Sequence, residues 1–224
     1  VDVKTKLELE QLKAIISDYD ALIVRSQTKV GAEVIESGKR LKVIGRAGVG
    51  IDNIDVDAAT RKGIVVVNAP TGNIIAAAEH TIALMLALAR NVPQANSHLR
   101  SGKWRREEFV GTEIRNKTLG IIGLGNVGSE VAKRVQAFEM RVIAHDPFVS
   151  KDYAHNLKVE LVSLDQLLTE ADFITVHVPL TATTKKFIGS KELAKLKPTA
   201  RIINCARGGV IDEEALYQAL ESGK

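Results

Sequence analysis

Residues 119–128 have the sequence LGIIGLGNVG, in which a short apolar run leads into a G-x-G-x-x-G motif. The apolar run predicts a buried strand, and residues 127–137 predict a helix that begins inside the motif. Gly123 permits a tight turn, Gly125 lets the backbone approach a ligand, and Gly128 lets helix and strand pack closely. Because a helix N-terminus binds anions, the stretch predicts a dinucleotide-binding α/β fold in which a side chain at position 125 blocks the cofactor.

An acidic residue follows the next predicted strand. That strand spans Arg141–Ala144, and Asp146 lies 18 residues after Gly128. This second signal matters because a G-x-G-x-x-G motif alone often arises by chance. A carboxylate at this place accepts hydrogen bonds from ribose hydroxyls and repels a 2′-phosphate, which favours NAD over NADP. The alternative is that Asp146 only ends a strand before Pro147.

Short β-branched runs alternate with helical stretches along the whole chain. Each run is nearly continuously apolar, as are strands buried on both faces of a parallel sheet. The alternation predicts an α/β layered fold. The predicted strands are Ala21–Val24, Leu41–Ile44, Ile64–Val67, Leu119–Ile122, Arg141–Ala144, Phe173–Val176 and Arg201–Asn204. The expected helix N-caps are Ser163 (with Gln166 completing a capping box), Ser190 before residues 191–196, and Asp212 before residues 213–220, which Gly223 ends.

The longest predicted helix extends from about Asn73 to Arg90, with Pro93 just beyond it. It separates two groups of strands, so we expect it to bridge two domains. Its apolar residues occupy more than one face, and such a helix needs a second surface to cover it. That surface is either the other domain of the same chain or a second subunit.

Composition limits the classes of protein that fit. With 224 residues, 45% hydrophobic and 26% charged, the chain can bury the cores of one large or two smaller domains. The longest apolar stretch, residues 81–89, is far shorter than the ~20 residues of a membrane span. The only cysteine is Cys205, and residues 1–4 lack the apolar core of a signal peptide, so we expect a reducing, cytoplasmic location. A net charge of +4, 4% aromatic residues and one compact basic run at 103–106 argue against nucleic-acid binding.

A second informative stretch, NCARGG at residues 204–209, follows the last predicted strand. It therefore lies at the carboxyl edge of the sheet, where open α/β sheets bind ligands. There the Arg207 guanidinium can donate two parallel hydrogen bonds to a carboxylate, and it can polarise a neighbouring carbonyl. The alternative is a surface arginine beside a glycine turn. We expect Cys205 to be a small buried hydrophobic residue rather than a nucleophile.

Two other places in the sequence are candidates for ligand contacts. The glycines of residues 45–50 can direct backbone N–H groups toward a second anion, and Arg25 and Ser26 end a neighbouring strand. Taken alone these are ordinary loop residues. His177 is the one histidine at a strand's carboxyl end near the proposed cofactor site, and we expect it to shape the cofactor wall rather than act as a base. No metal site is predicted.

Five segments in this order resemble the NAD-dependent D-2-hydroxyacid dehydrogenases, most closely the branch that acts on phosphoglycerate. They are GRAGVGIDNID at 45–55, the G-x-G-x-x-G helix, HDP at 145–147, FITVHVPLT at 173–181 and NCARGGVIDE at 204–213. The resemblance implies a Rossmann-type doubly wound parallel sheet plus part of a smaller flavodoxin-like α/β substrate domain. Residues 1–70 would be the N-terminal part of the substrate domain and 71–224 the NAD-binding domain, with chain missing at both ends.

The resemblance also assigns site residues. Arg207 would be the catalytic arginine that binds the substrate carboxylate and keto oxygen. The expected NAD contacts include the motif glycines and positions that flank the matched residues. They are Val49, Gly123, Gly125, Asn126, Val127, Gly128, Asp146, Pro147, His177, Val178, Pro179, Cys205, Ala206 and Arg207. The expected substrate contacts are Arg25, Ser26, Val49, Gly50 and Asn73.

The implied reaction is the oxidation of 3-phosphoglycerate to 3-phosphohydroxypyruvate, the entry step of serine biosynthesis. The family's general base is a histidine beyond the arginine loop, oriented by a glutamate, and the chain stops before both. Reduction of glyoxylate or hydroxypyruvate and oxidation of D-lactate are alternatives with the same machinery. An alternative from a different functional class is an NAD(H)-sensing binding protein that resembles the C-terminal-binding corepressors. The family resemblance implies a homodimer or homotetramer, with no nucleic-acid or membrane partner.

Overall fold

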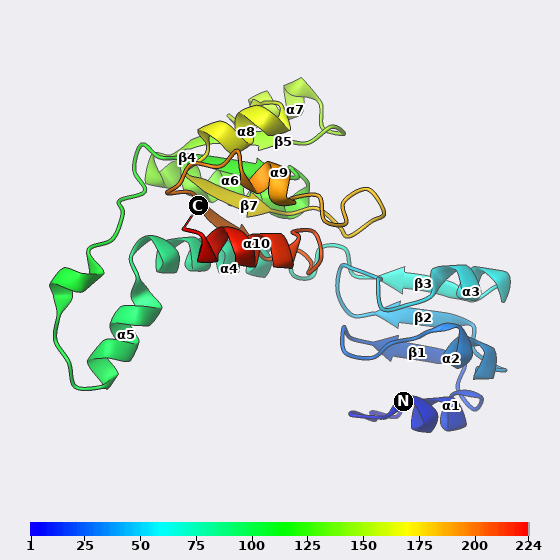
Figure 1. Cartoon of the computed structure of the whole chain (residues 1–224). Helices are drawn as coiled ribbons and strands as arrows, with labels where there is room; N and C mark the ends of the chain where they lie inside the picture. Colours follow the sequence, from blue (N-terminus) through cyan, green and yellow to red (C-terminus); the bar gives the residue numbers. More distant parts are fainter. Residues whose placement is uncertain (224) are drawn as a thin grey trace. The chain divides into compact units, whose positions relative to one another are not determined.

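The computed structural model describes residues 1–223 and divides the chain into two compact units, Val1–Asn73 and Ile74–Lys224 (Figure 1). Both units are built around parallel sheets with helices between successive strands. This is the α/β architecture that the alternating sequence pattern predicts. Each unit has its own hydrophobic core.

Unit 1, residues 1–73, contains a three-stranded parallel sheet in the order β1-β2-β3. Its strands are Ala21–Val24 (β1), Val43–Arg46 (β2) and Val65–Asn68 (β3), and its helices are Leu9–Ile16 (α1), Ala32–Ser37 (α2) and Val56–Arg61 (α3). All three helices pack on one face, because they share a hydrophobic cluster with Ile44 of the central strand. On the other face Ile23 and Val67 are exposed. The prediction that every strand is buried on both faces is therefore wrong for β1 and β3.

Unit 2 contains, within residues 74–223, a five-stranded parallel sheet in the order β6-β5-β4-β7-β8. Its strands are Thr118–Ile122 (β4), Arg141–His145 (β5), Glu160–Leu161 (β6), Phe173–Val176 (β7) and Arg201–Asn204 (β8). Its helices are Ile74–Ala89 (α4), Val92–Arg100 (α5), Arg106–Phe109 (η1), Asn126–Val135 (α6), Gln136–Phe138 (η2), Lys151–Asn156 (α7), Leu164–Glu170 (α8), Ser190–Leu193 (α9) and Glu213–Glu221 (α10). One face of the sheet packs against α4 and α6, and the other against α8, α9 and α10. The sheet is thus doubly wound, as predicted.

The strand order of unit 2 reverses at β4. The chain first adds β5 and β6 on one side of β4 and then crosses to add β7 and β8 on the other side. In open parallel sheets this reversal creates a crevice at the carboxyl ends of the strands, and ligands bind there. The loops that follow β4, β5, β7 and β8 all begin at this edge.

Most of the predicted elements form, with shifted ends. β1, β7 and β8 have the predicted bounds, whereas β2 begins two residues later than predicted and β6 was not predicted because it is only two residues long. The side chains of Ser163 and Asp212 accept hydrogen bonds from the helix N–H groups of Gln166 and Ala215, which confirms both N-caps. The capping box predicted at Ser163 does not form, because the Gln166 side chain donates to Glu170 instead. The prediction for Ser190 is wrong. It is the first helical residue of α9, and Gly189 is the N-cap.

The long helix of the sequence prediction ends where the backbone turns left-handed. α4 stops at Ala89, and Asn91 has φ of +52°, after which Pro93 lies in the first turn of α5. Within residues 1–223 no single helix is long and apolar enough to cross a membrane. The bent pair of α4 and α5 passes that test by length and composition only, with 66° between the helices.

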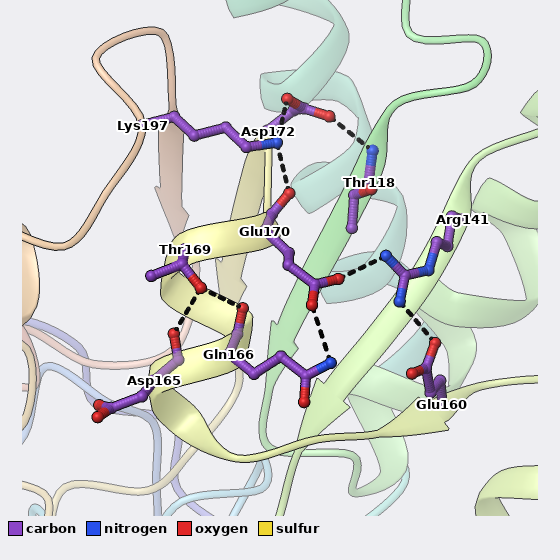
Figure 2. Close-up of polar contacts among 9 residues, drawn as sticks. All are labelled: Thr118, Arg141, Glu160, Asp165, Gln166, Thr169, Glu170, Asp172 and Lys197. Carbon is purple, nitrogen blue, oxygen red and sulfur yellow. Dashed lines mark hydrogen bonds and ion pairs between the residues drawn. The ribbon is translucent and has the colours of Figure 1, made fainter.

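The amino-terminal edge of the unit 2 sheet is held together by ion pairs (Figure 2). Arg141, the first residue of β5, donates to Glu160 of β6 at 2.7 Å and to Glu170 at the end of α8 at 2.6 Å. Both glutamates hold the pKa of the Arg141 guanidinium above its ordinary value, with desolvation acting in the opposite direction. The pairs are partly exposed, so each stabilises the fold only slightly.

Asp172 joins two further strands at the same edge (Figure 2). Its carboxylate accepts hydrogen bonds from the Thr118 N–H at 2.8 Å and from the Lys197 ammonium at 2.9 Å. Partial burial raises the pKa of Asp172, but these two donors outweigh it and hold that pKa below its ordinary value. The polar network therefore ties the beginnings of β4 and β7 together and leaves the opposite, carboxyl-terminal edge to the ligand loops.

Candidate functional site

The glycine motif forms the turn between β4 and α6. Gly123 has φ of +92°, a left-handed conformation, and its N–H donates to the His145 carbonyl at 3.0 Å. A Cβ at Gly128 would lie 2.1 Å from the carbonyl oxygen of Gly123, so a larger residue does not fit. A Cβ at Gly125 would meet no atom within 4 Å. The fold itself thus requires Gly123 and Gly128, whereas Gly125 borders open space at the N-terminus of α6, where an anion is favoured.

The carboxylate of Asp146 lies against this glycine turn. Its Oδ2 accepts a hydrogen bond from the Leu124 N–H at 2.8 Å, and its Oδ1 accepts one from the Phe148 N–H at 2.9 Å. The pairing of Ile122 with His145 in adjacent strands brings the turn and the acid together. An ionised carboxylate has about four acceptor positions, so it can still bind ribose hydroxyls. Asp146 therefore does more than end a strand.

The segment after β7 forms the other side of the glycine turn. The His177 N–H donates to the Ile122 carbonyl at 2.8 Å, and Val178 Cγ1 lies 2.8 Å from the place a Gly123 Cβ would take. Burial lowers the pKa of His177 to about 4, and among the described residues its Nε2 has no hydrogen-bond partner. The imidazole is therefore neutral near pH 7, which suits a wall residue better than an acid or base. The contact of His177, Val178 and Pro179 with a cofactor stays a prediction.

The arginine loop follows β8 and is closed by the side chain of Asn204. Asn204 Nδ2 donates to the Arg207 carbonyl at 2.9 Å, and its Oδ1 accepts from the Ala206 N–H at 3.0 Å. The half-buried Arg207 also donates through Nη1 to the Ala206 carbonyl at 2.8 Å. Cys205 is partly buried and packs against the hydrophobic core, which supports its expected role as a small hydrophobic residue.

The unit 2 residues expected to contact NAD share one edge of one sheet. They lie in the loops after β4, β5, β7 and β8 or in the first turns of α6, all at the carboxyl ends of the strands. This set comprises Gly123, Gly125, Asn126, Val127, Gly128, Asp146, Pro147, His177, Val178, Pro179, Cys205, Ala206 and Arg207. A turn with a helix N-terminus for the pyrophosphate and a carboxylate for the ribose fits a dinucleotide.

The expected substrate residues lie in unit 1. Arg25 and Ser26 are exposed in the loop after β1, and Val49 and Gly50 are partly buried in the loop after β2. The two loops adjoin because β1 and β2 are paired strands. Asn73 is the last residue of unit 1. Their contact with a substrate stays a prediction.

Sequence reasoning missed two asparagines that shape these loops. One is Asn204. The other is Asn53, whose Nδ2 donates to the carbonyls of Arg25 at 3.0 Å and Thr28 at 2.7 Å. An asparagine that ends a strand just before a glycine-rich turn is a signal for Asn204, because this side chain bonds to its own backbone two residues on. The sequence carries no comparable signal for Asn53, whose partners lie more than twenty residues away.

A hollow of about 650 Å³ lies elsewhere, between α5 and η1. It is lined by Pro93, Gln94, Ser97, His98, Ser101, Lys103 and Phe109. It shares no residue with the glycine turn or the arginine loop. Arg105 in the basic run pairs with Glu108 at 2.9 Å, and both side chains are exposed.

Together, the doubly wound sheet, the glycine turn and its carboxylate define a dinucleotide-binding α/β protein. Residues 82–224 match the family model described as "D-isomer specific 2-hydroxyacid dehydrogenase, NAD binding domain". The chain therefore belongs to the D-isomer specific 2-hydroxyacid dehydrogenases. The resemblance, the fold class and NAD as the cofactor are confirmed.

Proteins with known names agree with this assignment. A D-3-phosphoglycerate dehydrogenase of Synechocystis is 55% identical over 100% of this chain and 40% of its own length. One of Archaeoglobus fulgidus is 57% identical over 100% of this chain and 42% of its own length. The structure of a D-lactate dehydrogenase of Aquifex aeolicus, complexed with NAD and lactic acid, has a TM-score of 0.86 and 33% identity over 95% of this chain and 64% of that one. The chain thus spans 40–42% of the length of these curated relatives.

Proposed function

We propose that the chain is part of an enzyme that oxidises 3-phosphoglycerate to 3-phosphohydroxypyruvate with NAD, in the biosynthesis of serine. The observation that carries the proposal is the placement of the glycine turn, Asp146 and the Arg207 loop along one sheet edge. Two relatives more than half identical over the whole chain bear the name of this enzyme. In the reaction, C2 of the acid would lose a hydride, for which bound NAD would be the acceptor, and the C2 hydroxyl would lose its proton to a base.

The residues of this chain have distinct tasks in that scheme. The N-terminus of α6 holds the pyrophosphate, and Asp146 accepts hydrogen bonds from the ribose hydroxyls. Bound NAD supplies the hydride acceptor. Arg207 binds the substrate carboxylate and stabilises the oxygen on C2 as its charge changes. Because burial lowers the pKa of His177 to about 4, its protonated form is strongly disfavoured and it is a poor proton acceptor; the general base expected from the family lies beyond the arginine loop.

A phosphorylated substrate requires cationic side chains. Arg46 lies over Gly48, where a Cβ would collide with the guanidinium. Its Nη1 donates to the Ala47 carbonyl at 3.3 Å, while its buried Nε has no hydrogen-bond partner among the described residues. Arg25 is exposed in the neighbouring loop. An unsatisfied buried donor beside an exposed arginine supports recognition of an anionic group.

The test is NADH oxidation by the full-length protein that contains this sequence. Phosphohydroxypyruvate, hydroxypyruvate and glyoxylate are compared side by side, and we expect the highest kcat/KM with the phosphorylated acid. A higher kcat/KM with hydroxypyruvate or glyoxylate would agree with the proposed mechanism but contradict 3-phosphoglycerate as the substrate. Tight NADH binding without turnover of any acid would point to a sensor of the corepressor type.

The role of the phosphate is tested separately. Arg25→Ala and Arg46→Ala should raise the KM for phosphohydroxypyruvate and leave the KM for glyoxylate nearly unchanged. Unchanged KM values for the phosphorylated acid in both variants would contradict the phosphate assignment.

The proposal includes a homodimer formed through unit 2. No residue of α5 is buried. Val92 and Leu99 of this helix and Trp104 just after it are exposed. The helix α5 extends away from the sheet of unit 2 (Figure 1). Covering these apolar side chains with a second copy would stabilise the pair. Light scattering after size exclusion should give twice the subunit mass, and Leu99→Asp should give the monomer. A wild-type monomer would contradict the dimer.

A further inference from the structure

The loops after β1 and β2 are joined by a single side chain. Asn53 belongs to the segment after β2, and its Nδ2 donates to two carbonyls of the loop after β1, Arg25 at 3.0 Å and Thr28 at 2.7 Å. The backbone of Asn53 strengthens the junction, because its carbonyl accepts from the Val30 N–H at 2.8 Å. The junction therefore uses the side chain and the main chain of the same residue.

The chemistry of this contact is specific for an amide. An NH₂ group carries two donors on one atom, and here both are directed to carbonyl oxygens that end the loop around Ser26. An aspartate at position 53 has nearly the same shape but only acceptors, so it would face two oxygens. A serine offers one donor on a shorter side chain. The contact can thus be removed or weakened with little change in volume.

The side chain of Asn53 acts where the expected substrate residues lie. It fixes the carbonyl of Arg25 itself, and it lies three and four residues after Gly50 and Val49. The carbonyl of Val49 is held in turn by Asn68 Nδ2 at 2.6 Å. Both loops therefore form one connected unit, and the direction of the Arg25 side chain depends on its anchored backbone.

We propose that Asn53 is a positioning residue for the substrate, because its amide holds the Arg25–Thr28 loop against the Val49–Asn53 segment. This inference rests on the proposed function. Except for Val49, the residues assigned to the nucleotide lie in unit 2, and the carbonyl of Val49 is held by Asn68, whereas the side chain of Asn53 bonds to Arg25 and Thr28. Asn53 should accordingly affect the acid and spare the cofactor.

The test compares Asn53→Asp with Asn156→Asp in the full-length protein. Asn156 ends α7 and is exposed, so the control makes the same chemical change away from the loop. We expect Asn53→Asp to raise the KM for the acid about ten-fold or more, which corresponds to the loss of two hydrogen bonds, with the NADH Kd unchanged. Asn156→Asp should change neither value. Asn53→Ser, which keeps one donor, should have an intermediate KM.

Two further measurements keep the outcome decisive. Hydrogen exchange of the amides of residues 25–30 should accelerate in Asn53→Asp and not in Asn156→Asp, whether or not turnover is measured. An unchanged KM, or unchanged exchange in this loop, would overturn the inference. If Asn53→Asp does not fold, the KM for the acid and the hydrogen exchange of residues 25–30 are measured in Asn53→Ser instead, and unchanged values would overturn the inference. If the wild type prefers an acid other than phosphohydroxypyruvate, the proposed substrate fails, and the role of Asn53 is judged with the acid that is reduced.

Discussion

The N–H of Leu124 donates to Oδ2 of Asp146 at 2.8 Å, which fastens the acid after β5 to the glycine turn after β4. The residue expected to select the ribose is therefore also part of the support of the pyrophosphate turn. A substitution at position 146 can act through its charge or through this hydrogen bond, and the two effects are separable.

Asp146→Asn removes the charge and keeps an oxygen that can accept from Leu124. Because a carboxylate repels a 2′-phosphate and the amide does not, we expect the ratio of the NADPH and NADH dissociation constants to fall about ten-fold or more. Fluorescence titration measures both constants. An unchanged ratio would show that the charge of Asp146 does not select the cofactor. Asp146→Ala, which also removes the acceptor, should weaken the binding of both nucleotides.

Gly125→Ala and Gly128→Ala should separate binding from folding. The Cβ at position 125 meets nothing, so this variant should lose less than ~1 kcal/mol of unfolding free energy and lose NADH affinity. The Cβ at position 128 would lie 2.1 Å from a carbonyl oxygen, so this variant should lose ~1–3 kcal/mol or more. Denaturant unfolding and NADH titration provide the two readouts. Equal affinity of wild type and Gly125→Ala would refute a pyrophosphate site there.

Arg207→Lys keeps the positive charge and loses the planar fork. Since a lysine cannot make two parallel hydrogen bonds to a carboxylate, we expect kcat of the full-length protein to fall by about two to three powers of ten. The NADH dissociation constant should change much less than kcat. Steady-state kinetics and NADH titration check this expectation, which fails if lysine supports turnover at the wild-type rate.

The partly buried His177, whose Nε2 is buried, should make folding sensitive to weak acid. Its pKa is about 4 in the folded protein against 6.5 in the unfolded chain, so below pH 6.5 the unfolded chain binds the extra proton. The stabilising contribution is complete above pH 6.5 and is lost as the pH falls toward 4, by about 2 kcal/mol between pH 7 and pH 5. Denaturant unfolding at both pH values should show a smaller decrease in His177→Gln. The exposed His155→Gln should behave like the wild type, and an identical decrease in all three proteins would contradict the assignment.

The features that sequence predicted well are local ones. The turn at Gly123 and Gly128 could be predicted because a strand, three glycines and a helix follow one another within a dozen residues. Asp146 could be predicted because the next strand always returns to the same edge in a parallel sheet. Both features depend only on the order of elements along the chain.

The features that escaped prediction depend on distant partners or on competition between neighbours. Asn53 binds carbonyls that only the pairing of β1 with β2 brings near. Ser190 has the right side chain for an N-cap, but the helix begins one residue earlier, and the Glu192 carboxylate accepts from the Gly189 N–H instead. β6 is too short to leave an apolar pattern.

The hydrophobic cores described above divide cleanly along the chain. The buried members of the unit 1 cluster lie between Leu12 and Ile64, and those of unit 2 begin at Ala78. A crossover between two related genes at Asn73 would therefore leave each described cluster with its original neighbours. Recombination at this junction would exchange the unit 1 loops, which carry most of the expected substrate contacts, without disturbing the glycine turn and the arginine loop of unit 2, so new substrate preferences could arise by shuffling whole segments rather than by gradual repacking.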